Sequence, residues 1–223
     1  MIPRVAIYLA PALSDPLWAA ACAWLGRDPE TAATLPQPAL TDIHAVTADA
    51  RLYGIHCTLK APMRLMTHYN AFLDDAEALA ASLPAFDLPP LRVADLSGFL
   101  ALREAAPCPA LRTLADACVE GLDQHRAPPT EAELARRRAG GLSPARDAYL
   151  KRWGYPLVFE EWRFHMTLTC RLTEPEHALF RPAAQAHFAP ALPHPRRVRD
   201  ICIFTQPAAG KPFMLAERLP LRG

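Results

Sequence analysis

Two short stretches of this chain share one pattern, and together they constrain its fold more than any other feature. Residues 54–60 read Gly-Ile-His-Cys-Thr-Leu-Lys, and residues 163–172 read Arg-Phe-His-Met-Thr-Leu-Thr-Cys-Arg-Leu. In both, polar and apolar residues alternate with a period of two, which is typical of a β-strand with one buried face. The chain is therefore expected to contain two strands that each carry a His-x-Thr-Leu motif.

Side chains suited to chemistry share one face of each predicted strand. They are His56, Thr58 and Lys60 in the first strand, and His165, Thr167, Thr169 and Arg171 in the second. Such a face places a proton-transfer group beside hydroxyls and cations that can bind an oxyanion. Both predicted strands therefore offer the same kind of chemistry.

The repetition gives the motif its weight. With 8 His in 223 residues, two His-x-Thr-Leu matches by random placement are expected in roughly one chain in a thousand of this composition. A single histidine on a half-apolar strand is most simply a structural residue. Two histidines, each in strand phase with a basic residue further along the same face, favour a catalytic pair.

The composition is that of an ordinary globular protein. Hydrophobic residues make up 51% and charged residues 21% of a chain with net charge +1, so no global field would attract nucleic acid, although a local basic cleft is compatible with it. No apolar run reaches the roughly 18 residues of a membrane span. The short apolar run at the N-terminus reads as a strand rather than a signal peptide. We expect a cytoplasmic protein without membrane contact.

The 6 Cys are scattered without a Cys-x-x-Cys spacing. We interpret them as reduced, mostly buried small apolar residues. No ligand spacing supports a zinc site at His56 or His165, and neither a metal nor a cofactor is expected. The 24 Pro cluster in connections and predict long, stiff loops.

Further elements follow from periodicity and from helix start and stop signals. The expected strands and helices are a strand at 5–10, a helix at 16–25, the first motif strand at 56–61, a helix at 69–83, strands at 86–93 and 99–103, helices at 110–125 and 143–153, the second motif strand, a helix at 174–188 and a hairpin of 198–205 with 213–218. Segments 27–47 and 126–162 are expected to be the connections that set specificity. Within the second, Arg136, Arg137 and Arg138 predict a short exposed helix, either salt-bridged to its glutamates or, as the alternative, facing an anionic substrate.

This order suits an antiparallel α+β architecture better than a doubly wound sheet. The pattern of strand, helix, strand, strand recurs in the second half of the chain. We expect residues 1–223 to form one bilobal domain with pseudo-symmetric lobes. Each lobe would contribute one His-x-Thr strand to an antiparallel sheet, with both polar faces lining a central cleft and the helices outside.

Paired His-x-Thr strands about one lobe apart resemble the 2H phosphoesterase superfamily, which includes 2′-5′ RNA ligase-like proteins and cyclic nucleotide phosphodiesterases. Further segments are similar to the branch encoded in bacterial phosphonate-utilisation operons. They are Leu17-Trp18, residues 24–28, residues 53–62, residues 159–169 and Pro220-Leu221. Cys57 stands where that branch would have a small Ala, on the face expected to be buried.

The resemblance implies a bilobal 2H phosphoesterase-like fold, two catalytic histidines, two phosphate-binding threonines and no metal. It does not fix a substrate. The operon association suggests a cyclic or diester phosphate from phosphonate breakdown, such as a ribosyl cyclic phosphate.

Diester hydrolysis needs a base and an acid on opposite sides of the phosphorus, and histidine suits both roles. We assign these roles to His56 and His165, in an order that the sequence leaves open, and oxyanion binding to Thr58 and Thr167. Lys60, Thr169 and Arg171 have the right strand phase for phosphate contacts. Tyr8 and Tyr53 could stack on a base or sugar of the substrate, with a purely structural role as the alternative.

Three other functions are compatible with the sequence. The chain could be an RNA- or nucleotide-binding module, although binding alone needs no pair of proton-transfer groups and the charge does not favour RNA. It could be a metal-dependent hydrolase, which a chelator would reveal. It could catalyse 2′-5′ ligation or transfer, because the same two histidines can run the reverse reaction. Neither the oligomeric state nor the exact substrate follows from the sequence.

Overall fold

The computed structural model describes residues 4–223, and it is an α+β protein in which every strand pairing is antiparallel. The strands are β1 (Arg4–Leu9), β2 (Cys57–Arg64), β3 (Phe86–Leu88), β4 (Leu91–Asp95), β5 (Phe99–Glu104), β6 (Met166–Arg171), β7 (Arg196–Val198), β8 (Asp200–Gln206) and β9 (Met214–Pro220). The α-helices are α1 (Pro16–Leu25), α2 (Ile43–Val46), α3 (Ala48–Tyr53), α4 (Tyr69–Ser82), α5 (Pro109–Gly121), α6 (Glu131–Arg138), α7 (Pro144–Trp153) and α8 (Glu174–Phe188). Two short 3₁₀ helices are η1 (Asp123–His125) and η2 (Phe159–Glu161).

Two main sheets each carry one motif strand at an edge. The first has the order β2-β1-β8-β9 and the second the order β4-β5-β6, and β3 and β7 form a separate two-stranded ribbon. The motif strands β2 and β6 are therefore edge strands. The edge position explains why β2 continues through Pro62, beyond the predicted end at residue 61, because an edge strand tolerates a missing N–H.

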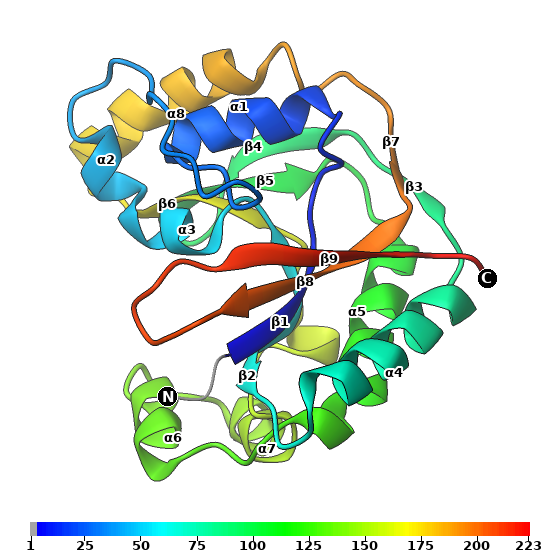
Figure 1. Cartoon of the computed structure of the whole chain (residues 1–223). Coiled ribbons are helices and arrows are strands. Elements are labelled where there is room, and N and C mark those ends of the chain that lie inside the picture. The colour runs from blue at the N-terminus through cyan, green and yellow to red at the C-terminus, as the bar shows by residue number, and fades with distance from the viewer. Residues whose placement is uncertain (1–3) are drawn as a thin grey trace.

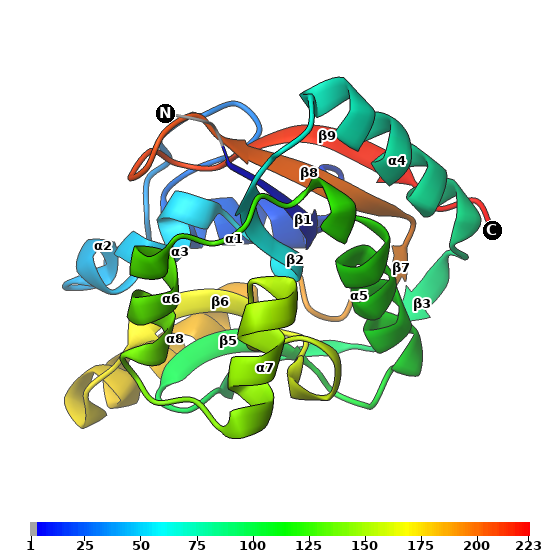
Figure 2. The same cartoon turned by 90° about the horizontal axis from the view of Figure 1, so that it is seen from below.

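The helices cover the outer faces of the two sheets (Figure 1). Helices α4 and α5 pack beside the first sheet, on β9 and β2, whereas α1 and α8 pack together over the second. Helices α6 and α7 lie beside one another at one end of the molecule, as both views show (Figure 2). This arrangement confirms the expectation of two antiparallel sheets with helices outside.

The two sheets do not follow the two halves of the chain. Strands β1 and β2 come from the first half and pair with β8 and β9 from the end of the chain, while β6 completes the sheet of β4 and β5. The recurring order of elements in the sequence does not show which strands pair with one another. Hydrogen-bond pairing between distant strands decides this, and it leaves no local signal.

Capping residues define the helices at the predicted places. The Asp15 carboxylate accepts a hydrogen bond from the Leu17 N–H at the start of α1, and Gly26 ends that helix in the left-handed region at φ 74°. Thr130 and Thr173 each form a capping box, at the starts of α6 and α8. The short helices α2 and α3 were not predicted, because each is shorter than the two turns that a period of 3.6 needs to become visible.

One apolar core runs through both sheets, and the cysteines belong to it. All six are free thiols; Cys22, Cys57, Cys118 and Cys202 are buried and the other two are half-buried, which confirms the prediction of reduced, mostly buried residues. Within residues 4–223, no helix is both long and apolar enough to cross a lipid bilayer.

Candidate active site

The two motif histidines are held in the same way, each one residue before an edge strand begins. The Nδ1 of His56 lies 2.8 Å from the carbonyl oxygen of Gly54, and the Nδ1 of His165 lies 2.8 Å from that of Arg163. A carbonyl only accepts, so each Nδ1 carries the proton and donates it. Each ring therefore keeps Nε2 as the nitrogen that can accept or deliver a proton to a substrate.

Gly54 makes the first of these contacts possible. Its φ is 74°, a left-handed value that an L side chain rarely adopts, and a Cβ at this position would lie 2.7 Å from Pro29. The loop before β2 can therefore turn its carbonyl toward His56 only with glycine at this position.

Tryptophan side chains satisfy one backbone carbonyl of each motif strand. The indole N–H of Trp162 donates to the Thr58 carbonyl at 2.8 Å, and that of Trp24 donates to the Leu168 carbonyl at 3.1 Å. The Cys57 thiol also lies against the backbone of His165. Unpaired groups of an edge strand would otherwise need water or another chain.

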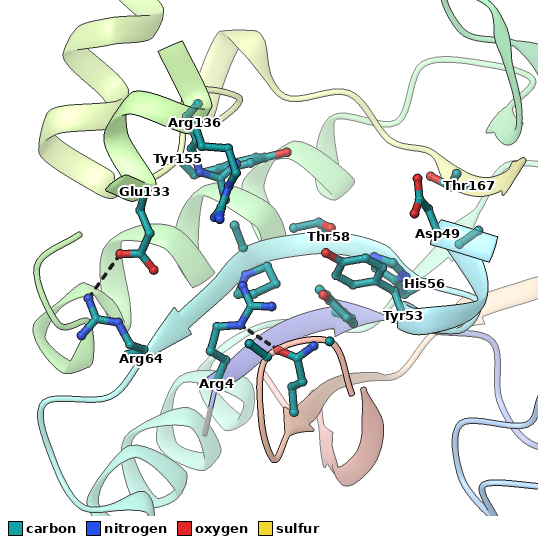
Figure 3. A pocket seen from close by; sticks show the side chains of 18 of the residues that line it. Arg4, Asp49, Tyr53, His56, Thr58, Arg64, Glu133, Arg136, Tyr155 and Thr167 are labelled. Atoms are coloured by element: carbon teal, nitrogen blue, oxygen red, sulfur yellow. Dashed lines mark hydrogen bonds and ion pairs between the residues drawn. The ribbon is translucent and has the colours of Figure 1, made fainter. Parts of the chain in front are cut away.

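Both motifs open into one cavity of about 680 Å³ (Figure 3). The residues that line it and carry chemistry are Arg4, Tyr8, Asp49, Tyr53, His56, Thr58, Arg64, Glu133, Arg136, Arg137, Tyr155, His165, Thr167 and Gln206. The structure thus brings His56, His165, Thr58 and Thr167 together as the alternation predicted. Among residues 4–223, no protein group is bonded to the hydroxyls of the two threonines, in contrast to the buried hydroxyl of Thr169.

Burial keeps both imidazoles neutral at neutral pH. It lowers the pKa of His56 to about 4, an effect that the nearby His165 increases and the bond to Gly54 opposes. Burial also lowers the pKa of His165, and its bond to Arg163 opposes the shift. An anionic substrate between the rings would favour their charged forms and raise both pKa values.

Tyr8 and Tyr53 surround His56. The Tyr8 ring stacks on the imidazole with centroids 3.9 Å apart, and the Tyr53 ring lies 5.8 Å from it. Tyr53 also stacks on Phe213 at 5.1 Å. The Tyr8 hydroxyl is buried without a hydrogen-bond partner among residues 4–223, and burial raises its pKa well above the usual value, so it stays a phenol. Both tyrosines therefore help to hold His56 and still face the cavity.

Lys60 lies outside the cavity, and the prediction that it shares a face with Thr58 is wrong. In β1, the adjacent residues Ile7 and Tyr8 pair with Lys60 and Thr58 of β2, respectively. Leu59, between those two partners, is therefore an extra residue in β2. Such a β-bulge reverses the alternation. The Lys60 ammonium is buried instead, 3.0 Å from the Asp123 carboxylate and 2.8 Å from the Val119 carbonyl.

A second irregularity removes Thr169 and Arg171 from the site. Phe99 pairs with Arg171 but Ala101 pairs with Thr167, so three residues of β6 lie opposite one residue of β5. Thr169 is buried there, and its hydroxyl accepts a hydrogen bond from the Leu100 N–H at 3.0 Å. Arg171 is exposed beside Gly98 and does not line the cavity. The phosphate contacts predicted for these two residues are not supported.

Three arginines line the other end of the cavity, and no signal in the sequence pointed to Arg4 among them. Arg4 comes from β1, and Arg136 and Arg137 come from α6. In the part of the chain that the structure describes, pairing of the arginine run with the glutamates of its own helix is not found, since Arg138 pairs with Asp147 of α7. Arg136 and Arg137 line the cavity, as the alternative interpretation predicted. Segment 126–162 therefore contributes to the cavity as expected, whereas none of the described lining residues comes from segment 27–47.

The arrangement provides two proton-transfer groups, hydroxyl donors and guanidinium groups around one space. No three His, Cys, Asp or Glu side chains of residues 4–223 gather in a way that could hold a metal ion. These groups suit general acid–base chemistry on an anionic oxygen ester.

A family model described as "Protein of unknown function (DUF1045)" matches residues 58–214. The chain belongs to this family. Two curated relatives carry the name "Ribose 1,5-bisphosphate phosphokinase PhnN". That of Janthinobacterium sp. (strain Marseille) is 39% identical over 231 residues, which cover 99% of this chain and 51% of the relative. That of Laribacter hongkongensis (strain HLHK9) is 39% identical over 218 residues, covering 95% and 50%. The chain spans about half the length of these relatives.

Solved structures of E. coli LigT are similar to this chain over its whole length. The complex with NADP+ aligns with a TM-score of 0.46 and 13% identity, covering 100% of this chain and 99% of that one. The complex with 3′-AMP aligns with a TM-score of 0.47 and 12% identity, covering 100% of both.

Proposed function

We propose that this chain is a two-histidine phosphoesterase of the 2H type, which hydrolyses a cyclic or diester phosphate without a metal ion. One observation carries the proposal: His56 and His165 are fixed through Nδ1 in the same way and face one cavity together with Thr58 and Thr167. Binding alone would not need two such groups in matched orientations, whereas acid–base catalysis on a phosphodiester does.

In the proposed reaction, a water molecule attacks the phosphorus and gives its proton to the neutral histidine. The P–O bond opposite the attacking oxygen breaks, and the leaving oxygen takes a proton from the protonated histidine. One water is consumed, and a cyclic phosphate becomes a monoester with a free hydroxyl. The hydroxyls of Thr58 and Thr167 donate to the non-bridging oxygens, where negative charge grows. Proton exchange with solvent then restores the pair.

The pKa of His56 favours one assignment of the two roles. Burial lowers it to about 4, so His56 suits the neutral base, which leaves the role of the acid to His165. Because the two rings interact, their titration belongs to the pair. Substrate binding, which raises both pKa values, would bring the acid closer to the working pH.

For the substrate we propose a small ribosyl or nucleotide phosphate linked to phosphonate metabolism. The PhnN name of the relatives accords with the phosphonate-associated branch that the motifs resemble. The sequence contains no glycine-rich loop of the Walker A type, G-x-x-x-x-G-K-[ST], which argues against a P-loop kinase reaction in this chain.

The test is phosphorus NMR of the purified protein in EDTA with ribose 1,2-cyclic phosphate, 2′,3′-cyclic nucleotides and a 2′-5′ dinucleotide. We expect one of these to be hydrolysed. His56→Ala and His165→Ala should each lower the rate by about 10²- to 10⁴-fold, the usual contribution of a positioned acid or base. His68→Ala is the control, because His68 is exposed and outside the cavity.

Each alternative has its own outcome. Line broadening without turnover indicates a binding module, activity that EDTA abolishes indicates a metal-dependent enzyme, and a new diester signal indicates ligation. Full activity in His56→Ala contradicts the proposal outright.

A further inference from the structure

Three arginines at one end of the cavity have no carboxylate partner among residues 4–223. They are Arg4, Arg136 and Arg137, and each lines the cavity. Neighbouring arginines differ, since Arg64 pairs with Glu133 and Arg138 pairs with Asp147. Figure 3 shows Arg4 on β1 and Arg136 on α6, both at this end of the cavity.

Neutral groups hold two of these guanidinium groups, those of Arg137 and Arg4, in place. The Arg137 guanidinium lies over the Tyr155 ring, 4.6 Å from its centroid. The Nε of Arg4 donates to the Gln206 side chain at 2.8 Å. An arginine has five N–H donors, so both side chains are oriented while most of their donors stay available.

The charges at this end repel one another. Burial lowers the pKa of Arg137, and the nearby Arg136 and Arg4 lower it further, while Tyr155 opposes them. The two carboxylates of the cavity do not relieve this. Glu133 is bonded to Arg64 and to the Thr130 N–H, and Asp49 lies at the other end near Thr167 (Figure 3). A bound anion would compensate this charge.

Arg4 and the motif threonine of β2 stand at separate positions along the paired strands β1 and β2. Arg4 pairs with Arg64, and Tyr8 pairs with Thr58, at opposite ends of the same two strands. Four residues along a strand span roughly 13 Å. A ligand that extends along the cavity could therefore place one anionic group at the threonines and a second at the arginines.

We propose that Arg4, Arg136 and Arg137 form a second phosphate subsite, so that the substrate is a cyclic or diester phosphate that also carries a separate phosphate monoester. Arginine suits this task, because its planar fork binds phosphate oxygens in pairs. The assignment rests on the proposed function for the histidine end of the cavity, and it narrows the substrate to doubly phosphorylated esters.

The first experiment compares each cyclic phosphate of the panel with its derivative that carries a phosphate on the primary hydroxyl. We expect the derivative to have a roughly 10- to 100-fold higher kcat/KM, the range for hydrogen bonds to charged groups. Arg137→Gln should bring the ratio of the two kcat/KM values toward one. Arg137→Lys, which keeps the charge and loses the fork, should give an intermediate ratio, and Arg138→Gln should leave it unchanged. Equal kcat/KM values in the unaltered protein overturn the inference and leave the proposed function intact.

The second experiment needs no turnover. Calorimetry measures binding of ribose 5-phosphate, with ribose as the control ligand. We expect ribose 5-phosphate to bind and Arg137→Gln to weaken its binding roughly 10- to 100-fold, with no effect of Arg138→Gln. This result would support the subsite even if no cyclic phosphate were hydrolysed. Absence of binding, or equal binding in Arg137→Gln, overturns it.

Discussion

At Tyr8 the ring and the hydroxyl have separate roles. The ring stacks on His56 and restricts the imidazole plane, whereas the hydroxyl is buried without a partner among residues 4–223. Leaving a buried hydroxyl unsatisfied costs about 1–3 kcal/mol. A substrate oxygen that reaches this hydroxyl would recover that free energy on binding.

We therefore expect Tyr8→Phe to raise the free energy of unfolding by about 1 kcal/mol and to raise KM for the cyclic phosphate about tenfold. Thermal unfolding and steady-state kinetics measure the two effects. Tyr69→Phe is the matched control: the Tyr69 hydroxyl is also buried and unpartnered among residues 4–223, but it lies outside the cavity. This control should change stability alone. An unchanged KM in Tyr8→Phe would show that its hydroxyl does not contact the substrate.

The two histidines set the pH response of the proposed reaction. The base must be neutral, so kcat/KM should rise as the pH increases through about 4, the pKa to which burial lowers His56. The acid must be protonated, so kcat/KM should fall as the pH increases through the pKa of His165, which burial lowers from its ordinary value near 6.5. The optimum of kcat/KM should therefore lie below pH 6.5. A value that still increases from pH 7 to pH 9 would disprove this assignment.

At the scale of the element, the bulge at Leu59 decides what β2 contributes. Thr58 stays in the cavity, whereas Lys60 is turned into an ion pair with Asp123, which Arg126 and Arg152 also contact. The same short strand therefore contributes Thr58 to the cavity and Lys60 to a buried ion pair.

We expect Lys60→Met to lower the free energy of unfolding by about 2–4 kcal/mol, because breaking a buried pair leaves a carboxylate without one of its partners. KM for the cyclic phosphate should not change. Denaturant unfolding and steady-state kinetics test both statements. Lys151→Met is the control, since Lys151 forms an exposed pair with Asp147 that contributes about 0.5 kcal/mol or less. A large rise of KM in Lys60→Met would restore a phosphate role for this residue.

The sequence predicted the side-chain positions correctly where the strand alternation is regular, and wrongly where an irregular pairing interrupts the alternation. Period-two spacing placed His56 with Thr58 and His165 with Thr167 in one cavity. It could not foresee the irregularities that remove Lys60 and Thr169, because no residue type marks them. The helices predicted at 16–25 and 174–188 have the observed bounds, since start and stop signals act within one turn.

At the scale of the whole molecule, the two sheets and α6 contribute different groups to the site. The edges of the two sheets carry the groups proposed for chemistry, and α6 with the start of β1 carries the arginines. A chain of net charge +1 thus has a strongly basic region at one end of its cavity. The net charge does not reveal this basic region, because the region forms only when the fold brings Arg4 to the same cavity as a helix from the middle of the chain.

The pairing of β1 with β8 has a consequence for how the protein folds during its synthesis on the ribosome. β1 comprises Arg4–Leu9, whereas its inner partner starts at Asp200. At about 5–20 residues per second, translation would leave β1 without that partner for on the order of 10–40 s. During this interval an apolar strand of the nascent chain has an open edge, the kind of surface that chaperones shield and that aggregates recruit. The sheet beneath His56 is thus among the last parts of the protein that can form.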